Sequence, residues 1–169
     1  MGLQSLKKLL HNDPKLIHEY YDFLLECYVR GDRINKMTIS EIFADFLDEK
    51  SVEEAVNLMI KDVKANYKTG SSVMDIIDLI IQNILRLCSK NYYANVSDPD
   101  WFLLDVLLVI LPIVKNVKTT QLAIDILLDF TLRVEEIRDT AIEFGTKLLT
   151  SLESGDISFR SFCQSPFLF

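Results

Sequence analysis

Residues 97–150 read SDPDWFLLDVLLVILPIVKNVKTTQLAIDILLDFTLRVEEIRDTAIEFGTKLLT, which is three helix-length segments with almost no spacer between them. The first segment is apolar at nearly every position, and a helix that is apolar all round must have neighbours on nearly every side. The next two segments join through RVEEIRDTA, which contains neither glycine nor proline. The chain must therefore fold back tightly or bend there, and the whole stretch predicts stacked helical hairpins.

The rest of the chain repeats the sequence signals of helix starts. Two of them place an acidic cap before a proline at the first helical position, and two have the spacing of a capping box. The four are Asp13-Pro14, Asp98-Pro99, Thr38-x-x-Glu41 and Ser51-x-x-Glu54. Pro112 predicts the end of the apolar helix or a kink in it. The helical spacing of apolar residues predicts the last two helices over about residues 119–133 and 134–152.

These segments predict one architecture. No segment alternates strictly between apolar and polar residues, so we expect no sheet. We expect an all-α fold, a right-handed α-solenoid of HEAT- or armadillo-like helical hairpins with about eight helices. It occupies residues 1–152, and residues 153–169 form a C-terminal tail. The weak internal repeat leaves a compact irregular bundle as an alternative, and the apolar stripe of Leu3, Leu6 and Leu10 predicts a preceding neighbour in a longer solenoid.

Composition places the chain among globular proteins. Hydrophobic residues make up 49% and charged residues 25%, as in a folded domain. The formal net charge of −7 argues against nucleic-acid binding, because phosphate contacts require clustered Lys and Arg. The N-terminus lacks the pattern of a signal peptide, and Trp101–Val114 is shorter than the ~20 residues that cross a bilayer. We therefore expect a soluble, intracellular protein.

The sequence contains no motif for catalysis, a cofactor or a metal. His11 and His18 are the two histidines, and a zinc site needs more nitrogen or sulfur ligands at close spacing. Three carboxylate pairs are expected on solvated helix faces: Asp45/Asp48, Asp75/Asp78 and Asp125/Asp129. The three cysteines, Cys27, Cys88 and Cys163, form no CxxC pair. We expect no catalytic, cofactor-binding or metal residue, and the residues that bind partners stay unknown.

Five further side chains have expected structural roles. Trp101 opens the apolar helix directly after its cap, which favours core packing over a ligand-stacking platform. Arg133 and Arg138 flank the bend between the last two helices, where their guanidinium groups could bind carbonyls or acids. Cys27 and Cys88 lie within apolar helical patterns, so we expect buried free thiols in a reducing compartment.

Several segments follow the pattern of one known family. Residues 91–110, NYYANVSDPDWFLLDVLLVI, resemble NYxxIxxFEWYxxVLxxL, and residues 123–144, AIDILLDFTLRVEEIRDTAIEF, resemble AxQMLDVAxRVxxIRxFAV. Residues 53–63, EEAVNLMIKDV, resemble EIVxxLMxHV, and residues 2–28 have the pattern of a trunk helix pair. Over roughly residues 2–150 the chain thus resembles the helical trunk of delta-adaptin, the delta subunit of adaptor protein complex 3. One departure is GDRINKMTISEIFADFL at residues 31–47, where the family has DxDxSIRxRALDLL.

The resemblance implies a function and a set of partners. It implies a non-catalytic scaffold subunit, or a fragment of one, in a vesicle-coat adaptor complex that transports proteins from Golgi or endosome to lysosome or vacuole. Its partners would be beta-, mu- and sigma-type adaptins and an Arf-type GTPase, with peripheral association to Golgi and endosomal membranes through the complex and no cofactor. The alternatives are an unrelated HEAT-type scaffold in nuclear transport or RNA processing, and a small helical enzyme.

Overall fold

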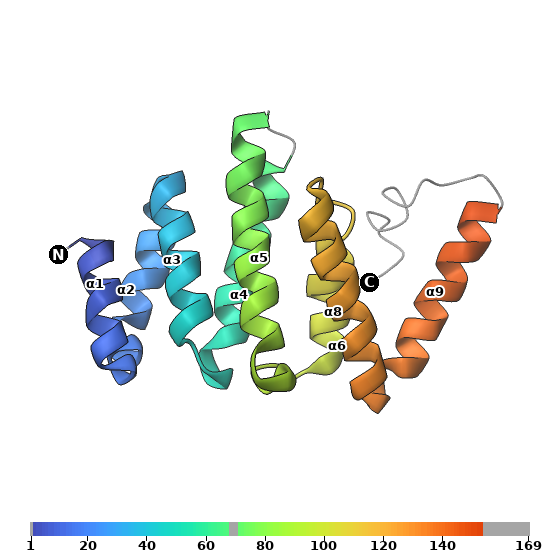
Figure 1. The fold of residues 1–169 in the computed structure, drawn as a ribbon. Coiled ribbons are helices and arrows are strands. Elements are labelled where there is room, and N and C mark those ends of the chain that lie inside the picture. Colours follow the sequence, from blue (N-terminus) through green and yellow to red (C-terminus); the bar gives the residue numbers. More distant parts are fainter. Residues whose placement is uncertain (1, 68–70, 154–169) are drawn as a thin grey trace. The chain divides into compact units, whose positions relative to one another are not determined.

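The computed structural model describes residues 2–67 and 71–153 of the chain. Every regular element in these residues is a helix (Figure 1), which confirms the predicted all-α fold class. The chain divides into two compact units, Met1–Val96 and Ser97–Phe169. Residues 154–169, which hold most of the predicted tail and Cys163, lie outside the described residues, so their role stays a prediction.

The first unit is a stack of helices in two layers. Its elements are α1 (Leu3–Asn12), η1 (Pro14–Leu16), α2 (Ile17–Arg30), α3 (Arg33–Phe46), α4 (Glu49–Asn66) and α5 (Ser71–Tyr93). Helix α3 packs between α1 and α5, while α2 and α4 lie against α3 and α5 in the other layer (Figure 1). Successive hairpins thus add one helix to each layer, as in α-solenoids. The predicted stacking of helical hairpins is confirmed in this unit.

Helix α3 is the centre of the first unit. It contacts all four of the other α-helices there, and its side chains Ile39, Ile42 and Phe43 are completely buried. One buried polar bridge joins α3 to α5, because the Asn83 side-chain amide donates to Ser40 Oγ at 2.9 Å. Buried polar groups are normally paired in this way, and the pair fixes how α5 lies on α3.

Two of the four predicted helix starts are confirmed. The Asp13 side chain accepts a hydrogen bond from the Lys15 backbone N–H ahead of η1 and α2. The Asp98 side chain accepts one from the Trp101 backbone N–H at 3.1 Å. In both places a proline occupies the first helical turn, where it has no N–H to leave unpaired.

The two predicted capping boxes are wrong. Helix α3 starts at Arg33 because Asp32 caps it, with Asp32 Oδ1 accepting from the Asn35 N–H at 2.8 Å. Thr38 lies inside the helix and is buried. Helix α4 likewise starts at Glu49, so Ser51 already lies in its first turn. A capping residue needs an extended backbone, which Asp32 and Asp48 both have, although only the Asp32 side chain accepts a cap hydrogen bond.

The second unit contains the segments that are densest in apolar residues. Its elements are α6 (Pro99–Trp101), the π-helix η2 (Phe102–Leu107), α7 (Leu108–Ile110), α8 (Val117–Arg133), η3 (Glu135–Ile137) and α9 (Arg138–Glu153). The first three form one continuous helical run, and Pro112 lies in the turn directly after it, as predicted. Phe102 meets Phe130 of α8 edge to face, with ring centroids 4.9 Å apart. In the described part of both units, no helix is long and apolar enough to cross a membrane.

The end of α5 is a left-handed turn. The backbone leaves the helix at Lys90, where ψ is 138°. The next three residues, Asn91, Tyr92 and Tyr93, have φ values of 50°, 57° and 67°, a region that non-glycine residues enter at an energetic cost. This turn opens the loop that leads to the Asp98 cap of α6.

Candidate functional site

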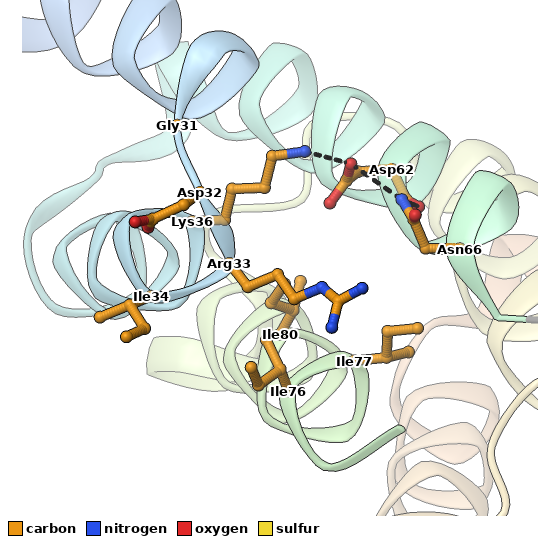
Figure 2. A pocket seen from close by; sticks show the side chains of 10 residues that line it. All are labelled: Gly31, Asp32, Arg33, Ile34, Lys36, Asp62, Asn66, Ile76, Ile77 and Ile80. Carbon is orange, nitrogen blue, oxygen red and sulfur yellow. Dashed lines mark hydrogen bonds and ion pairs between the residues drawn. The ribbon is translucent and has the colours of Figure 1, made fainter. Parts of the chain in front are cut away.

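The candidate site is a pocket of about 580 Å³ in the first unit. It lies where the start of α3, the end of α4 and the first half of α5 meet (Figure 2). Its polar lining consists of Asp32, Arg33, Lys36, Asp62 and Asn66. Its apolar lining consists of Ile34, Ile76, Ile77 and Ile80. Because three helices that are separate in sequence contribute to it, no local motif could have predicted it.

Gly31 sets the approach of α2 to α3 and so the position of the pocket. A Cβ atom built on this glycine would lie 2.5 Å from the Cys27 carbonyl oxygen, which is closer than such atoms come in proteins. Only glycine therefore lets the chain pass this carbonyl and turn into α3. Asp32 then caps the new helix, and Arg33 becomes its first residue.

Asp62 is the centre of a polar cluster on one wall of the pocket. Its carboxylate forms an ion pair with Lys36 and accepts a hydrogen bond from the Asn66 amide at 3.2 Å (Figure 2). The Tyr28 hydroxyl, 3.5 Å away, donates to the other carboxylate oxygen. Burial, with the Asp62 charge as a further cause, raises the pKa of Tyr28 well above its ordinary range. The phenol thus stays protonated, and the Asp62 charge is compensated from three sides.

Arg33 is the cation of the pocket that lacks such compensation. Its guanidinium points into the space between Asp62 and the isoleucines of α5, whereas the Asp32 carboxylate points away from it (Figure 2). Asp32 Oδ1 is occupied by the α3 cap, and the Asp62 carboxylate by Lys36. Among the described residues, no carboxylate pairs with Arg33. The pocket therefore presents a positive charge beside an apolar surface.

A second pocket of about 730 Å³ is lined by residues of α1, α2 and the start of α3. Leu3, Tyr20, Phe23 and Cys27 line it, and the Phe23 side chain is 51% exposed. The stripe predicted to need a preceding neighbour is mostly covered within the unit, because Leu6 and Leu10 are buried and α1 packs on α3. The apolar surface that stays accessible here belongs largely to α2.

Helix α8 of the second unit carries an exposed apolar row. Ile124, Leu128 and Leu132 follow at four-residue spacing on one helix face and are 38%, 59% and 73% exposed. The opposite face holds the buried Ala123 and Phe130. Contiguous exposed apolar surface of this kind is typical of protein-binding regions.

His11 and His18 are both exposed and have ordinary neighbours. His11 packs edge to face on Phe46, with ring centroids 5.0 Å apart. His18 Nε2 lies 3.4 Å from Asp48 Oδ2, and both side chains are about half exposed. In the described residues, no group of three or more potential ligands is placed to hold a metal ion.

The prediction of solvated carboxylate pairs is wrong for two of their members. Asp45 is only 28% exposed and forms ion pairs with Arg86 at 2.9 Å and Lys7 at 3.5 Å. Asp78 is only 6% exposed, and its Oδ1 has no hydrogen-bond partner among the described residues. Helical periodicity assigns both to a polar face, but the packing of neighbouring helices covers that face. Asp125 and Asp129 do lie at the surface of α8, where they bind Gln121 and Arg133.

The expectations for Trp101, the hinge arginines and Cys88 agree with the structure, whereas the expected burial of Cys27 is wrong. Trp101 is buried at the helix start. The Arg138 guanidinium donates to the Leu132 carbonyl at 2.8 Å and pairs with Glu135 at 3.2 Å, which holds the turn between α8 and α9. Cys88 is buried and Cys27 half-buried, both as free thiols. Burial raises the pKa of Cys88, so its thiol is unreactive.

The comparisons with known proteins concern the sequence as a whole. No family model matches the chain, and no solved structure matches it. The AP-3 complex subunit delta of Schizosaccharomyces pombe is 24% identical over 149 residues. The chain is similar to AP-3 delta subunits. Subunit delta-1 of Bos taurus is 24% identical over 152 residues, and the delta subunit of Dictyostelium discoideum is 23% identical over 141 residues.

The similarity extends over most of this chain but over a small part of each relative. It covers 88%, 89% and 82% of the chain and 18%, 12% and 11% of the delta subunits of S. pombe, B. taurus and D. discoideum. The chain therefore spans less than a fifth of these relatives' length. Three matches of this extent support an adaptin-type relationship, in agreement with the resemblance found in the motifs.

Proposed function

We propose that the protein is a non-catalytic scaffold in a vesicle-coat adaptor complex of the AP-3 type. In this function it binds other adaptor subunits through the surfaces of its stacked helices. The observation that carries the proposal is the similarity to three AP-3 delta subunits over 82–89% of the chain. The helical stack supports it, because such stacks offer extended surfaces for other proteins.

The proposed partners are beta-, mu- and sigma-type adaptins, with an Arf-type GTPase as the recruiting factor. The protein would act at Golgi or endosomal membranes, on the transport route to lysosomes or vacuoles. It would reach the membrane peripherally, through the complex. The exposed apolar residues of α2 and α8 support a function in protein binding.

Affinity purification tests this proposal. The tagged 169-residue chain is expressed at its natural abundance in cells of the organism that encodes it. Proteins recovered with it are identified by mass spectrometry. We expect beta-, mu- and sigma-type adaptins in near-stoichiometric amounts, because a trunk subunit binds them stably. Their absence from a clean preparation that contains nuclear transport or RNA-processing factors would favour the alternative, an unrelated HEAT-type scaffold.

A matched variant makes the purification more informative. Leu128→Ser and Leu132→Ser change two residues that are 59% and 73% exposed, so the fold should tolerate both. If α8 is one of the binding surfaces, the double variant recovers fewer adaptins than the wild type. Ile142→Ser serves as the control, because Ile142 is also 65% exposed but lies on α9.

A further inference from the structure

We propose that the pocket at the start of α3 binds the C-terminal residue of a partner polypeptide. The terminal carboxylate would pair with Arg33, and an aliphatic last side chain would lie on the isoleucines. This proposal rests on the proposed function only in assuming that the partner is a protein. The ligand and its contacts follow from the charges and the lining of the pocket.

The charge of the pocket selects an anionic group. Lys36 and Asp62 neutralise each other, and the Asp62 carboxylate also accepts from Asn66 and Tyr28. The Arg33 guanidinium points into the cavity (Figure 2), and no carboxylate of the described residues pairs with it. A guanidinium has five donors in a planar fork that matches a carboxylate in two parallel hydrogen bonds. A carboxylate is therefore the complementary group.

The apolar lining selects what must accompany that carboxylate. Ile34 at the rim is 65% exposed and Ile76 is half-buried, so these two keep apolar surface in water, whereas Ile77 and Ile80 are almost completely buried. Branched aliphatic side chains pack well against such a surface and remove its apolar area from water. A ligand that filled only the charged half would leave this surface wet, so the complementary ligand carries both groups.

The size of the pocket requires the two groups to be close together. Arg33 and the isoleucines share one cavity of about 580 Å³. In a C-terminal residue a single carbon atom joins the carboxylate to the side chain. An internal Asp or Glu followed by a Leu or Ile would bring extra peptide groups into the cavity, and buried peptide groups without partners are unfavourable. Lys36, Asp62 and Asn66 already bind one another, so the chain terminus is the better match.

Methyl NMR on the full chain tests the proposal with small probes. N-acetylleucine has the terminal carboxylate and an isobutyl side chain, and N-acetylleucinamide has the same shape without the charge. We expect N-acetylleucine to shift the methyl signals of Ile34, Ile76, Ile77 and Ile80. The amide should bind about tenfold more weakly or worse, given the usual strength of charge-assisted hydrogen bonds. Ile142, exposed on α9, reports non-specific binding and should not shift.

Three variants locate the interaction. Arg33→Gln should abolish the difference between the two probes, and Ile34→Ser should weaken both. Lys8→Gln removes a positive charge from the exposed face of α1, outside both pockets, and should leave the titration unchanged. Arg33 and Ile34 are exposed, so neither change threatens folding.

Other outcomes overturn the proposal. Equal binding of acid and amide excludes the charge pairing, and no shift at saturating probe excludes the pocket as a ligand site. Tighter binding of N-acetyl-aspartyl-leucinamide than of N-acetylleucine would assign the carboxylate to an internal acidic residue. Because the titration uses the purified chain alone, its result is independent of whether adaptins are recovered with the protein.

Discussion

The side chains of Ser40 and Asn83, which are 43 positions apart in sequence, form a buried hydrogen bond of 2.9 Å. Ser40 Oγ also donates to the Met37 carbonyl at 2.7 Å. The bond therefore connects α5 to the backbone of α3, the two helices at the centre of the first unit. Its environment is almost free of water, so the two partners depend on each other.

Replacing Asn83 should destabilise the protein more than replacing both partners. Asn83→Leu leaves the Ser40 hydroxyl buried without its donor, and such a loss usually lowers the free energy of unfolding by about 1–3 kcal/mol. Adding Ser40→Ala removes the buried oxygen that has lost its donor and should restore part of that loss. Urea unfolding of the two single variants and the double variant measures the coupling; strictly additive losses would show that the bond contributes little.

Asp78 should lower the stability of the folded protein at neutral pH. Burial, followed by the charge of Asp75, raises the pKa of Asp78 above its ordinary value of 3.8. The folded state thus favours the protonated acid, and stability falls as the pH rises through the raised pKa. Asp78→Asn should therefore be more stable than the wild type at pH 7, and this gain should vanish as the pH falls below 3.8.

Unfolding midpoints of Asp78→Asn and of the wild type, measured from pH 3 to 8, test this difference in stability. Asp75→Asn is the matched control, because Asp75 is exposed and contributes only its charge. It should give a smaller gain over the same pH range. A loss of stability in Asp78→Asn at pH 7 would mean that the ionised carboxylate has a stabilising partner.

The left-handed turn after α5 should reverse the usual ranking of alanine and glycine. Tyr92 has φ of 57° and is 80% exposed. A left-handed backbone is unfavourable for residues with a Cβ by about 1 kcal/mol or more, whereas glycine adopts it freely. Tyr92→Gly should therefore be about 1 kcal/mol more stable than Tyr92→Ala. Thermal unfolding of the two variants decides this, and equal stabilities would show that the turn relaxes in solution.

Two glycine-to-alanine changes should have opposite effects. Gly31→Ala places a Cβ 2.5 Å from the Cys27 carbonyl oxygen, which should destabilise the unit by about 1–3 kcal/mol, as overpacking usually does. Gly145→Ala lies inside α9 with no atom within 4 Å of the new Cβ. That change should stabilise by about 0.5–1 kcal/mol through helix propensity. Denaturant midpoints of both variants against the wild type measure the contrast.

The parts of the fold that are decided locally could be predicted from the sequence. Asp98 before Pro99 predicts the helix start, and the apolar run predicts the burial of Trp101. Pro112 predicts the end of that run. The capping-box spacing at Thr38 predicts a start of α3 that is several residues too late. The choice of Asp32 as the cap depends on Gly31 making the turn out of α2, and that close approach is visible only in three dimensions.

The candidate site could not be predicted because its parts are brought together by packing. Arg33, Asp62 and Ile77 belong to α3, α4 and α5, and none of them has a motif around it. For Asp78 the sequence predicts exposure, and the packing of neighbouring helices makes that prediction wrong. Its spacing assigns it to a polar stripe, yet the structure buries it. Periodicity gives the faces of one helix but does not tell which neighbour covers each face.

The position of α3 has a consequence for synthesis of the protein. Helices α1 and α2 leave the ribosome before most of α3 does, but α3 also packs extensively on α5, which ends at Tyr93. Until α5 is available, the surface of α3 that packs on α5 therefore stays uncovered in the nascent chain. At elongation rates of about 5–20 residues per second, translating the intervening segment takes seconds. During this interval the growing chain is most exposed to aggregation and most in need of a chaperone.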